Sequence, residues 1–196
     1  MKKIFLISNS YKNTDYLIDS LPICDKDAVC LFNHASPKKI ERIKKHNNKF
    51  LFCSHHGKGN NDGYHGLSLA TKNEYFKEYT KIVLVKPSIK DVINKKFQDK
   101  NQNIEYYTHN KIQNDIQCNN ILIFKNYPKN RHMTSGMIAI IYFMAKQYDI
   151  NLVNFTAELS YNNKNFKRNC HFHGYHFEKT ILDYMKHNDL ANFFYS

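Results

Sequence analysis

The run Met133-Thr134-Ser135-Gly136 is the first place where residue types and spacing point to ligand chemistry. Two hydroxyl residues and a glycine stand directly before residues 137–145, the most apolar helix-length run in the chain. The N-terminal end of a helix presents unpaired N–H groups and the positive end of the helix dipole, so it suits a phosphate or a carboxylate. In the simpler alternative, Thr134 or Ser135 only caps the helix.

A second cluster of reactive residues extends from Cys170 to Glu178 and includes three histidines. The run behind it has helical character, so His173 would lie on the loop just ahead of a helix. A neutral imidazole there can accept a proton from a sugar hydroxyl as a general base. His176 and His171 are the alternative bases, and a surface histidine without a catalytic role fits the sequence equally well.

We expect no metal site in this chain. The possible ligands between Cys170 and Glu178 are more crowded than known zinc spacings. The glycine-rich stretch from Ser54 to Gly66 also contains three histidines, but their irregular spacing favours a polar loop at the rim of a sheet. There is neither a G-x-G-x-x-G fingerprint nor a G-x-S-x-G elbow, which argues against standard dinucleotide binding and that class of serine hydrolase.

Strand-like and helix-like segments alternate along the chain, which predicts an α/β fold with a doubly wound, mostly parallel sheet. We expect one Rossmann-like nucleotide-binding domain over residues 1–196. The predicted strands are residues 3–7, 28–33, 49–53, 81–85, 104–108, 121–124 and 151–155. The predicted helices are residues 14–20, 37–46, 72–78, 89–97, 137–145 and 178–185.

Two details of this outline bear on a site. Asn33 would stand at the carboxyl end of the second strand, where open α/β sheets bind their ligands. Ser36 and Pro37 are a typical cap and first residue of a helix. Ile40 and Ile43 would face inward on that helix, whereas its basic residues, Lys39 among them, are expected to face mostly outward.

The formal charge of +12 and the pI near 9.4 suit a polyanionic partner, but the lysines are dispersed along the chain. The five cysteines are an odd number without a C-x-x-C pair, which is typical of reduced thiols. The sequence shows neither a secretion signal nor an apolar run long enough for a membrane helix. We therefore expect a soluble cytoplasmic protein.

Taken in order, these features resemble the bacterial sialyltransferases of glycosyltransferase family 42. The resemblance covers about half of the chain, at its two ends, and it departs from the family where Ser10 follows Asn9 and where Ser54 replaces an asparagine after the third strand. The matching features are Met-Lys-Lys with an apolar strand and Asn9, then Leu21-Pro22, Val29-x-x-x-Asn33, Thr134-Ser135-Gly136 and a late histidine. The run His173-x-x-x-x-Glu178 is similar to that of short sialyltransferase-like proteins.

The resemblance implies a metal-independent glycosyltransferase that takes an acidic sugar, sialic acid or Kdo, from a CMP-sugar donor. The acceptor would be a cell-surface glycan of lipooligosaccharide or capsule, and the donor is a substrate, so no cofactor is implied. Tyr161 would assist the leaving phosphate, and His173 or His176 would be the base. The implied donor-binding residues are Asn9, Ser10 and Asn33 for the cytidine and phosphate, and Thr134, Ser135 and Gly136 for the carboxylate or phosphate.

The expected partners are the CMP-sugar and a glycan or glycolipid acceptor, and no nucleic acid is expected. Peripheral contact with the anionic inner face of the membrane and homo-oligomerisation both stay open. One alternative is a non-catalytic nucleotide- or sugar-binding protein of the same fold. Another is a basic nucleic-acid-associated protein, which would need a contiguous basic face with exposed aromatic residues.

Overall fold

The structure is a computed structural model. It describes residues 2–8, 14–33, 35–54, 78–85, 104–119, 121–128, 132–155 and 174–195. Several predictions concern residues outside these ranges, namely nearly all of the helix at 72–78, the helix at 89–97 and the glycine-rich loop after Ser54. The candidate site residues that lie outside them are Asn9, Ser10, Tyr161, His171 and His173.

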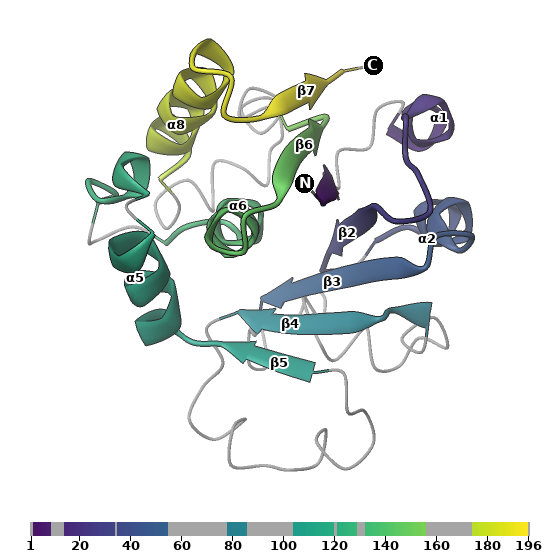
Figure 1. Cartoon of the computed structure of the whole chain (residues 1–196), viewed down its shortest axis with the longest axis horizontal. Helices are drawn as coiled ribbons and strands as arrows, with labels where there is room; N and C mark the ends of the chain where they lie inside the picture. Colours follow the sequence, from purple (N-terminus) through teal and green to yellow (C-terminus); the bar gives the residue numbers. More distant parts are fainter. Residues whose placement is uncertain are drawn as a thin grey trace, which may run out of the picture.

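Seven strands form one sheet in the order β5-β4-β3-β2-β1-β6-β7 (Figure 1). All neighbouring strands run parallel, which confirms the predicted α/β doubly wound architecture. The strands are β1 (Lys3–Ile7), β2 (Ala28–Phe32), β3 (Asn48–Ser54), β4 (Lys81–Val85), β5 (Ile104–Tyr107), β6 (Asp149–Val153) and β7 (Asn192–Phe194).

Helices cover both faces of the sheet (Figure 1). One layer consists of α1 (Thr14–Ser20) and α2 (Pro37–Ile43), and the other contains α5 (His109–Cys118), α6 (Ser135–Ala145) and α8 (Tyr175–His187). A short 3-10 helix, η2 (Leu122–Phe124), precedes α6. Because both faces are covered, the central strands are mostly apolar, and every residue of β2 is buried.

Among the described helices, α6 has the most buried residues, as its uniformly apolar sequence predicted. Residues 137 to 143 are all buried, and Phe143 packs edge-on against Phe50 of β3, with ring centroids 5.2 Å apart. Tyr142 makes a similar contact with Phe52 at 5.2 Å. The helix is therefore anchored rigidly on the sheet, and its first turn has a fixed position.

Several elements differ from the sequence predictions. The apolar run at residues 121–124 forms η2 rather than a strand, and the polar stretch after residue 109 forms α5, which buries only Ile112 and Ile116. Helix α2 ends at Ile43 instead of near His46, and β7 was not predicted. None of the helices within the described ranges is long and apolar enough to cross a lipid bilayer.

Candidate functional site

The strand order changes direction at β1. Strands β2 to β5 extend the sheet on one side of β1, and β6 and β7 extend it on the other. At the end of β1 the Ser8 N–H still donates to the Val153 carbonyl of β6 at 3.0 Å. In open α/β sheets, ligands bind beyond the carboxyl ends of the strands at such a switch point, so the end of β1 is the candidate place for a ligand site.

Two strands beside this point end in an asparagine with left-handed backbone. Asn33 follows β2 with a φ of 46°, and Asn154 follows β6 with a φ of 52°. Asparagine adopts this conformation more readily than most residues, so it lets the chain turn sharply off the sheet edge. The Asn33 N–H donates to the Phe52 carbonyl of β3 at 2.8 Å. Asn33 thus lies at the carboxyl end of β2, as the sequence predicted.

The first turn of α6 lies at the same edge of the sheet. Thr134 is the N-cap, and its hydroxyl oxygen accepts from the Met137 N–H at 3.3 Å. The N–H groups of Ser135 and Gly136 belong to the first turn, which has no intrahelical acceptors. They are hydrogen-bond donors at the positive end of the helix dipole.

Phe155 joins the first turn of α6 to the ends of β2 and β6. A Cβ atom added to Gly136 would lie 2.8 Å from Cε1 of Phe155, so only glycine fits at this position without movement of the ring. The Phe155 ring also packs edge-on against Phe32, the last residue of β2, with centroids 5.8 Å apart. The structure therefore brings together the two parts of the chain that contain Asn33 and Thr134-Ser135-Gly136.

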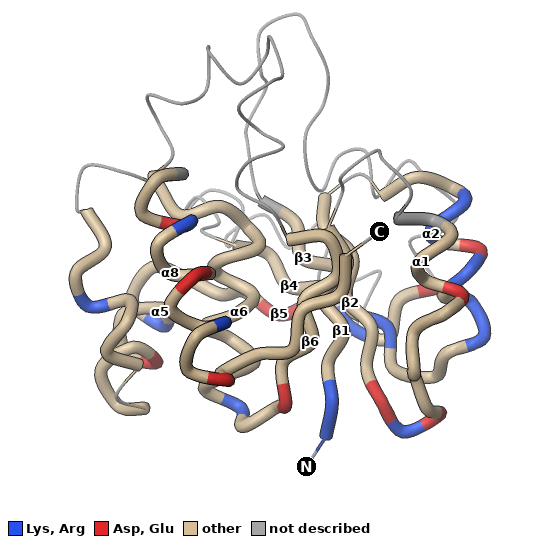
Figure 2. The backbone as a smooth tube through the Cα atoms, turned by 90° about the horizontal axis from the view of Figure 1, so that it is seen from above, with Lys and Arg blue, Asp and Glu red and all other residues tan. Residues whose placement is uncertain are grey.

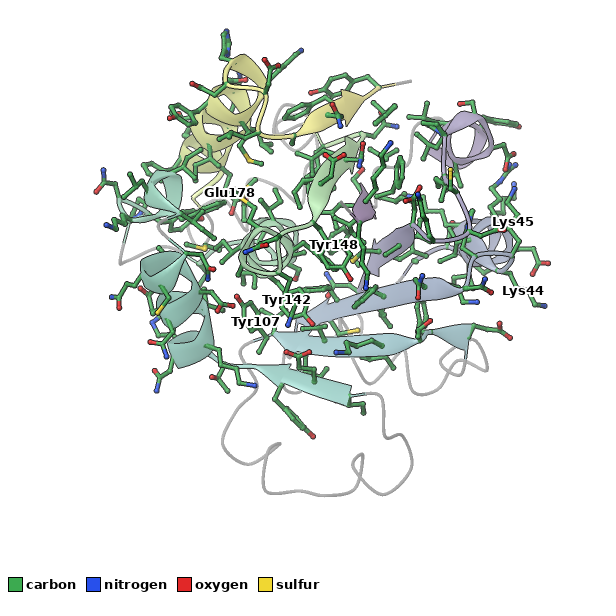
Figure 3. All side chains as sticks on the ribbon, in the orientation of Figure 1. Lys44, Lys45, Tyr107, Tyr142, Tyr148 and Glu178 are labelled. Carbon is green, nitrogen blue, oxygen red and sulfur yellow. The ribbon has the colours of Figure 1, made fainter. Side chains whose placement is uncertain are left out.

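The carboxylate of Glu178 binds the N-cap of α6. Glu178 comes from the first turn of α8, is buried, and lies between α8 and α6 (Figure 3). Its Oε1 accepts from the Thr134 N–H at 2.8 Å, and its Oε2 accepts from the Thr134 hydroxyl at 3.0 Å. The Tyr127 hydroxyl lies 2.9 Å from Oε1 and also accepts from the Gly174 N–H at 3.2 Å.

This arrangement resembles a capping box in which a second helix supplies the glutamate. In a capping box, a glutamate of the same helix binds the N–H of the N-cap residue. In α6 that position is Met137, and Glu178 of α8 provides the carboxylate instead. Thr134 is thus bound by the protein's own carboxylate, and the N–H groups of Ser135 and Gly136 are the further donors of this turn.

Of the three candidate bases, the structure describes only His176. His176 lies exposed in the first turn of α8, two residues before Glu178. Residues two apart on a helix point about 200° from one another, so His176 does not face α6 as Glu178 does. His173 precedes the N-cap Gly174 in the sequence and lies outside the described residues, as do His171, Tyr161, Asn9 and Ser10.

Two residues near this edge were missed by the sequence analysis. Lys39 was expected to face outward, but it is buried, with an exposed fraction of 4%, and its ammonium donates to the Ser8 carbonyl oxygen at 2.7 Å. The residue type of Lys39 indicated solvent, but Lys39 is buried together with Ile40 and Ile43, where α2 packs on the sheet. Tyr127 had no signal in the sequence beyond its position after η2.

Within the described ranges, no group of three or more His, Cys, Asp or Glu side chains is arranged to hold a metal ion. No family model, curated protein or solved structure matches the chain. The feature of the described residues that bears on function is the arrangement of hydrogen-bond donors. It consists of backbone and side-chain donors at the carboxyl edge of a parallel sheet, beside its switch point.

Proposed function

We propose that this protein is a glycosyltransferase that transfers an acidic sugar, sialic acid or Kdo, from a CMP-sugar to a cell-surface glycan. The observation that best supports this function is the meeting of Asn33 and the first turn of α6 at the switch point, through Phe155. A CMP-sugar of this kind has a phosphate and a carboxylate, and helix N-termini bind such anions. The choice of CMP as the nucleotide comes from the resemblance of the sequence to family 42 sialyltransferases.

The proposed roles follow from where the structure places Asn33 and the first turn of α6, and for Asn9, Ser10, Tyr161 and His173 they follow from the family resemblance. Asn33, with Asn9 and Ser10 after β1, contacts the cytidine and phosphate, while the N–H groups of Ser135 and Gly136 bind the carboxylate or phosphate. Tyr161 assists the leaving phosphate. We assign the general base to His173, because it precedes α8 in the sequence and the described alternative, His176, points away from α6.

The charge of the described elements is mixed and gives no preference for a nucleic acid over a small anionic ligand. Figure 2 shows Lys and Arg interspersed with Asp and Glu over the described elements. Most of the net charge of +12 belongs to residues outside these ranges. A nucleic-acid-binding protein uses a contiguous basic face to neutralise phosphates, and the described elements carry only a small part of the net positive charge.

The nucleotide is tested by thermal unfolding with CMP, CDP, UDP, GDP and NAD, each with and without magnesium. A ligand that binds only the native state at a hundred times its Kd raises the midpoint by roughly 5 to 10 °C for a chain of this size. We expect CMP to raise it without magnesium. If UDP or GDP raises the midpoint and CMP does not, the donor assignment is wrong. If none of the five ligands raises the midpoint, the result contradicts a nucleotide site.

Turnover is tested by CMP release from CMP-sialic acid and CMP-Kdo in the presence of a glycan acceptor. His173→Ala should reduce kcat by a factor of about 10² to 10⁴, as loss of a general base does, and should leave the CMP-induced shift intact. His187→Ala is the matched control, because His187 is exposed at the opposite end of α8. Equal turnover of His173→Ala and wild type would remove His173 from the mechanism. No release by the wild-type protein from either donor would favour a binding protein.

A further inference from the structure

The hydroxyl group of Tyr127 contacts the starts of two helices. It accepts a hydrogen bond from the Gly174 N–H at 3.2 Å and lies 2.9 Å from Oε1 of Glu178. The His132 carbonyl oxygen lies 3.1 Å from the same hydroxyl. A hydroxyl group has one proton and two acceptor lone pairs, so its proton can serve either the carbonyl of His132 or the carboxylate of Glu178.

These contacts join the two helix starts that border the candidate site. His132 belongs to the stretch that leads into α6, whose N-cap is Thr134. Gly174 is the N-cap of α8, and Glu178 lies in the first turn of that helix. Glu178 also accepts from the N–H and the hydroxyl of Thr134, and it lies between the two helices (Figure 3). Tyr127 and Glu178 together therefore link the beginning of α8 to the beginning of α6.

Tyr127 is itself held in place by its neighbours. Its N–H donates to the Phe124 carbonyl of η2 at 3.1 Å. Its ring packs edge-on against Phe177 of α8, with centroids 5.3 Å apart, and the residue is buried. A hydrogen bond in a buried environment is electrostatically stronger than one in water. The Tyr127 hydroxyl is therefore a well-fixed connection between the two helix starts.

The Gly174 N–H connects this cluster to the proposed chemistry. It belongs to the peptide bond between His173 and Gly174, so the acceptor of this N–H orients the planar peptide unit that follows the candidate base. The first turn of α6, which we propose binds the acidic sugar, is held by the same hydroxyl through Glu178. Transfer depends on how the base and the sugar are placed, and a displacement of about 1 Å can cost a factor of about 10² in rate.

We propose that Tyr127 is a positioning residue for the transfer reaction, because its hydroxyl keeps the start of α8 at a fixed distance from the first turn of α6. This inference rests on the proposed function, in which the base precedes α8 and the sugar is bound at α6. Tyr127 acts through Gly174 and Glu178 rather than by contact with the donor or the acceptor. Its loss therefore changes the rate of transfer more than the binding of the donor.

The test compares steady-state turnover of CMP-sialic acid and CMP-Kdo by the wild-type protein, Tyr127→Phe and Tyr142→Phe, well below the unfolding midpoint of all three. Tyr127→Phe removes only the hydroxyl group and keeps the ring that packs on Phe177. It should lower kcat by a factor of about 10 to 10² and change KM for the donor less than about twofold. Tyr142→Phe is the matched control, because it removes another tyrosine hydroxyl that bonds to a carboxylate, that of Glu105. This control should retain the wild-type kcat.

The pH dependence of kcat separates a positioning role from a direct one. The limb of the profile on the acidic side reports the base in the enzyme–substrate complex. Tyr127→Phe should keep this limb at the wild-type pH and lower the whole profile. A shifted or missing limb would mean that Tyr127 takes part in proton transfer and would overturn the inference. Equal kcat of Tyr127→Phe and the wild-type protein, or equal losses in the two phenylalanine variants, would overturn it as well.

A measurement on the wild-type protein covers a failure of Tyr127→Phe to fold. The Gly174 amide should exchange with deuterated solvent at least about tenfold more slowly than in an unfolded chain, because a buried hydrogen bond must open before exchange. Rapid exchange would overturn the inference. The two proposals fail in different ways. A wild-type protein that releases CMP from neither donor removes both, whereas an active wild-type protein with an equally active Tyr127→Phe variant removes only the role of Tyr127.

Discussion

Gly136 shows how a single residue type fixes the shape of the candidate site. It occupies the first turn of α6, where alanine would favour the helix by up to about 1 kcal/mol. The Phe155 ring fills the space that a Cβ atom would need. Glycine at this position lowers the helix propensity of α6 but allows close contact between α6 and Phe155, which follows β6.

Gly136→Ala should reduce the free energy of unfolding by about 1 kcal/mol, because the displaced Phe155 ring outweighs the gain in helix propensity. Urea unfolding measures this change. Gly136→Ala should cost less stability when it is made in a Phe155→Leu protein than in the wild-type protein, because the smaller leucine leaves room for the Cβ atom. A Gly136→Ala protein more stable than the wild-type protein would contradict the packing argument.

At the scale of elements, Glu178 couples α8 to the first turn of α6. One buried carboxylate accepts hydrogen bonds from the N–H and the hydroxyl of Thr134 and lies beside the Tyr127 hydroxyl. The start of α8, which follows the candidate base in the sequence, is thereby held against the turn that we propose binds the sugar. Movement of one helix end would disturb the other.

Glu178→Ala should lower the free energy of unfolding by about 3 kcal/mol, because it leaves buried donors without their acceptor. Asp183→Ala is the matched control on the same helix, where an exposed pair with Lys179 should contribute less than about 1 kcal/mol. A double-mutant cycle of Thr134→Val and Glu178→Gln should show coupling of about 1 kcal/mol or more. Additive effects in that cycle would contradict the proposed link.

A second carboxylate connects β5 to α6 and β4. Oε2 of Glu105 accepts from the Tyr142 hydroxyl at 2.7 Å and from the Lys81 ammonium at 3.1 Å. Figure 3 shows Tyr142 and Tyr107 close to this part of the sheet. Burial alone would raise the pKa of Glu105, but the hydrogen bonds from Tyr142 and Lys81 bring its pKa below the ordinary value of 4.5.

Because the pKa is lowered in the folded state, the stabilisation by Glu105 is complete above pH 4.5 and is lost as the pH falls through the folded value. Glu105→Gln should therefore be less stable than the wild-type protein by about 1 kcal/mol at pH 7, and this difference should shrink below pH 4.5. Urea midpoints from pH 7 to pH 3 measure it. Glu41→Gln, an exposed change on α2, is the control, and a constant difference at all pH values would refute the assignment.

The elements that the sequence predicted well are those with a strong apolar pattern. Continuous apolar runs indicated β1, β2 and β4, and Ser36-Pro37 marked the start of α2 correctly. Helix α5 was missed because two isoleucines four residues apart are its only buried residues. The apolar run at residues 121–124 was too short to distinguish a strand from a turn of helix.

The sequence predicted those parts of the candidate site that depend only on neighbouring residues in the chain. Thr134 caps α6 because a hydroxyl before an apolar helix does so in most contexts. Its partner Glu178 lies 44 residues further along the chain, and no local pattern gives that pairing. Lys39 was assigned to solvent by its residue type, whereas its burial follows from how α2 packs on the sheet.

At the scale of the whole molecule, β1 has neighbours from opposite ends of the described chain. One side of β1 pairs with β2, which follows soon after it in the sequence, and the other side pairs with β6. The Asn151 amide and the Ile4 carbonyl that it reaches are 147 residues apart. Contacts of such long range must close a large loop, which slows folding relative to local contacts.

This separation has a consequence for synthesis on the ribosome. Until β6 emerges, β1 has one unpaired edge and the apolar side chains of Ile4 to Ile7 lack part of their cover. An uncovered apolar strand edge pairs readily with other chains, so nascent or truncated forms that end before residue 149 are the species that chaperones must protect. The switch point that we propose for ligand binding is thus also a part of the sheet that can form only late in synthesis.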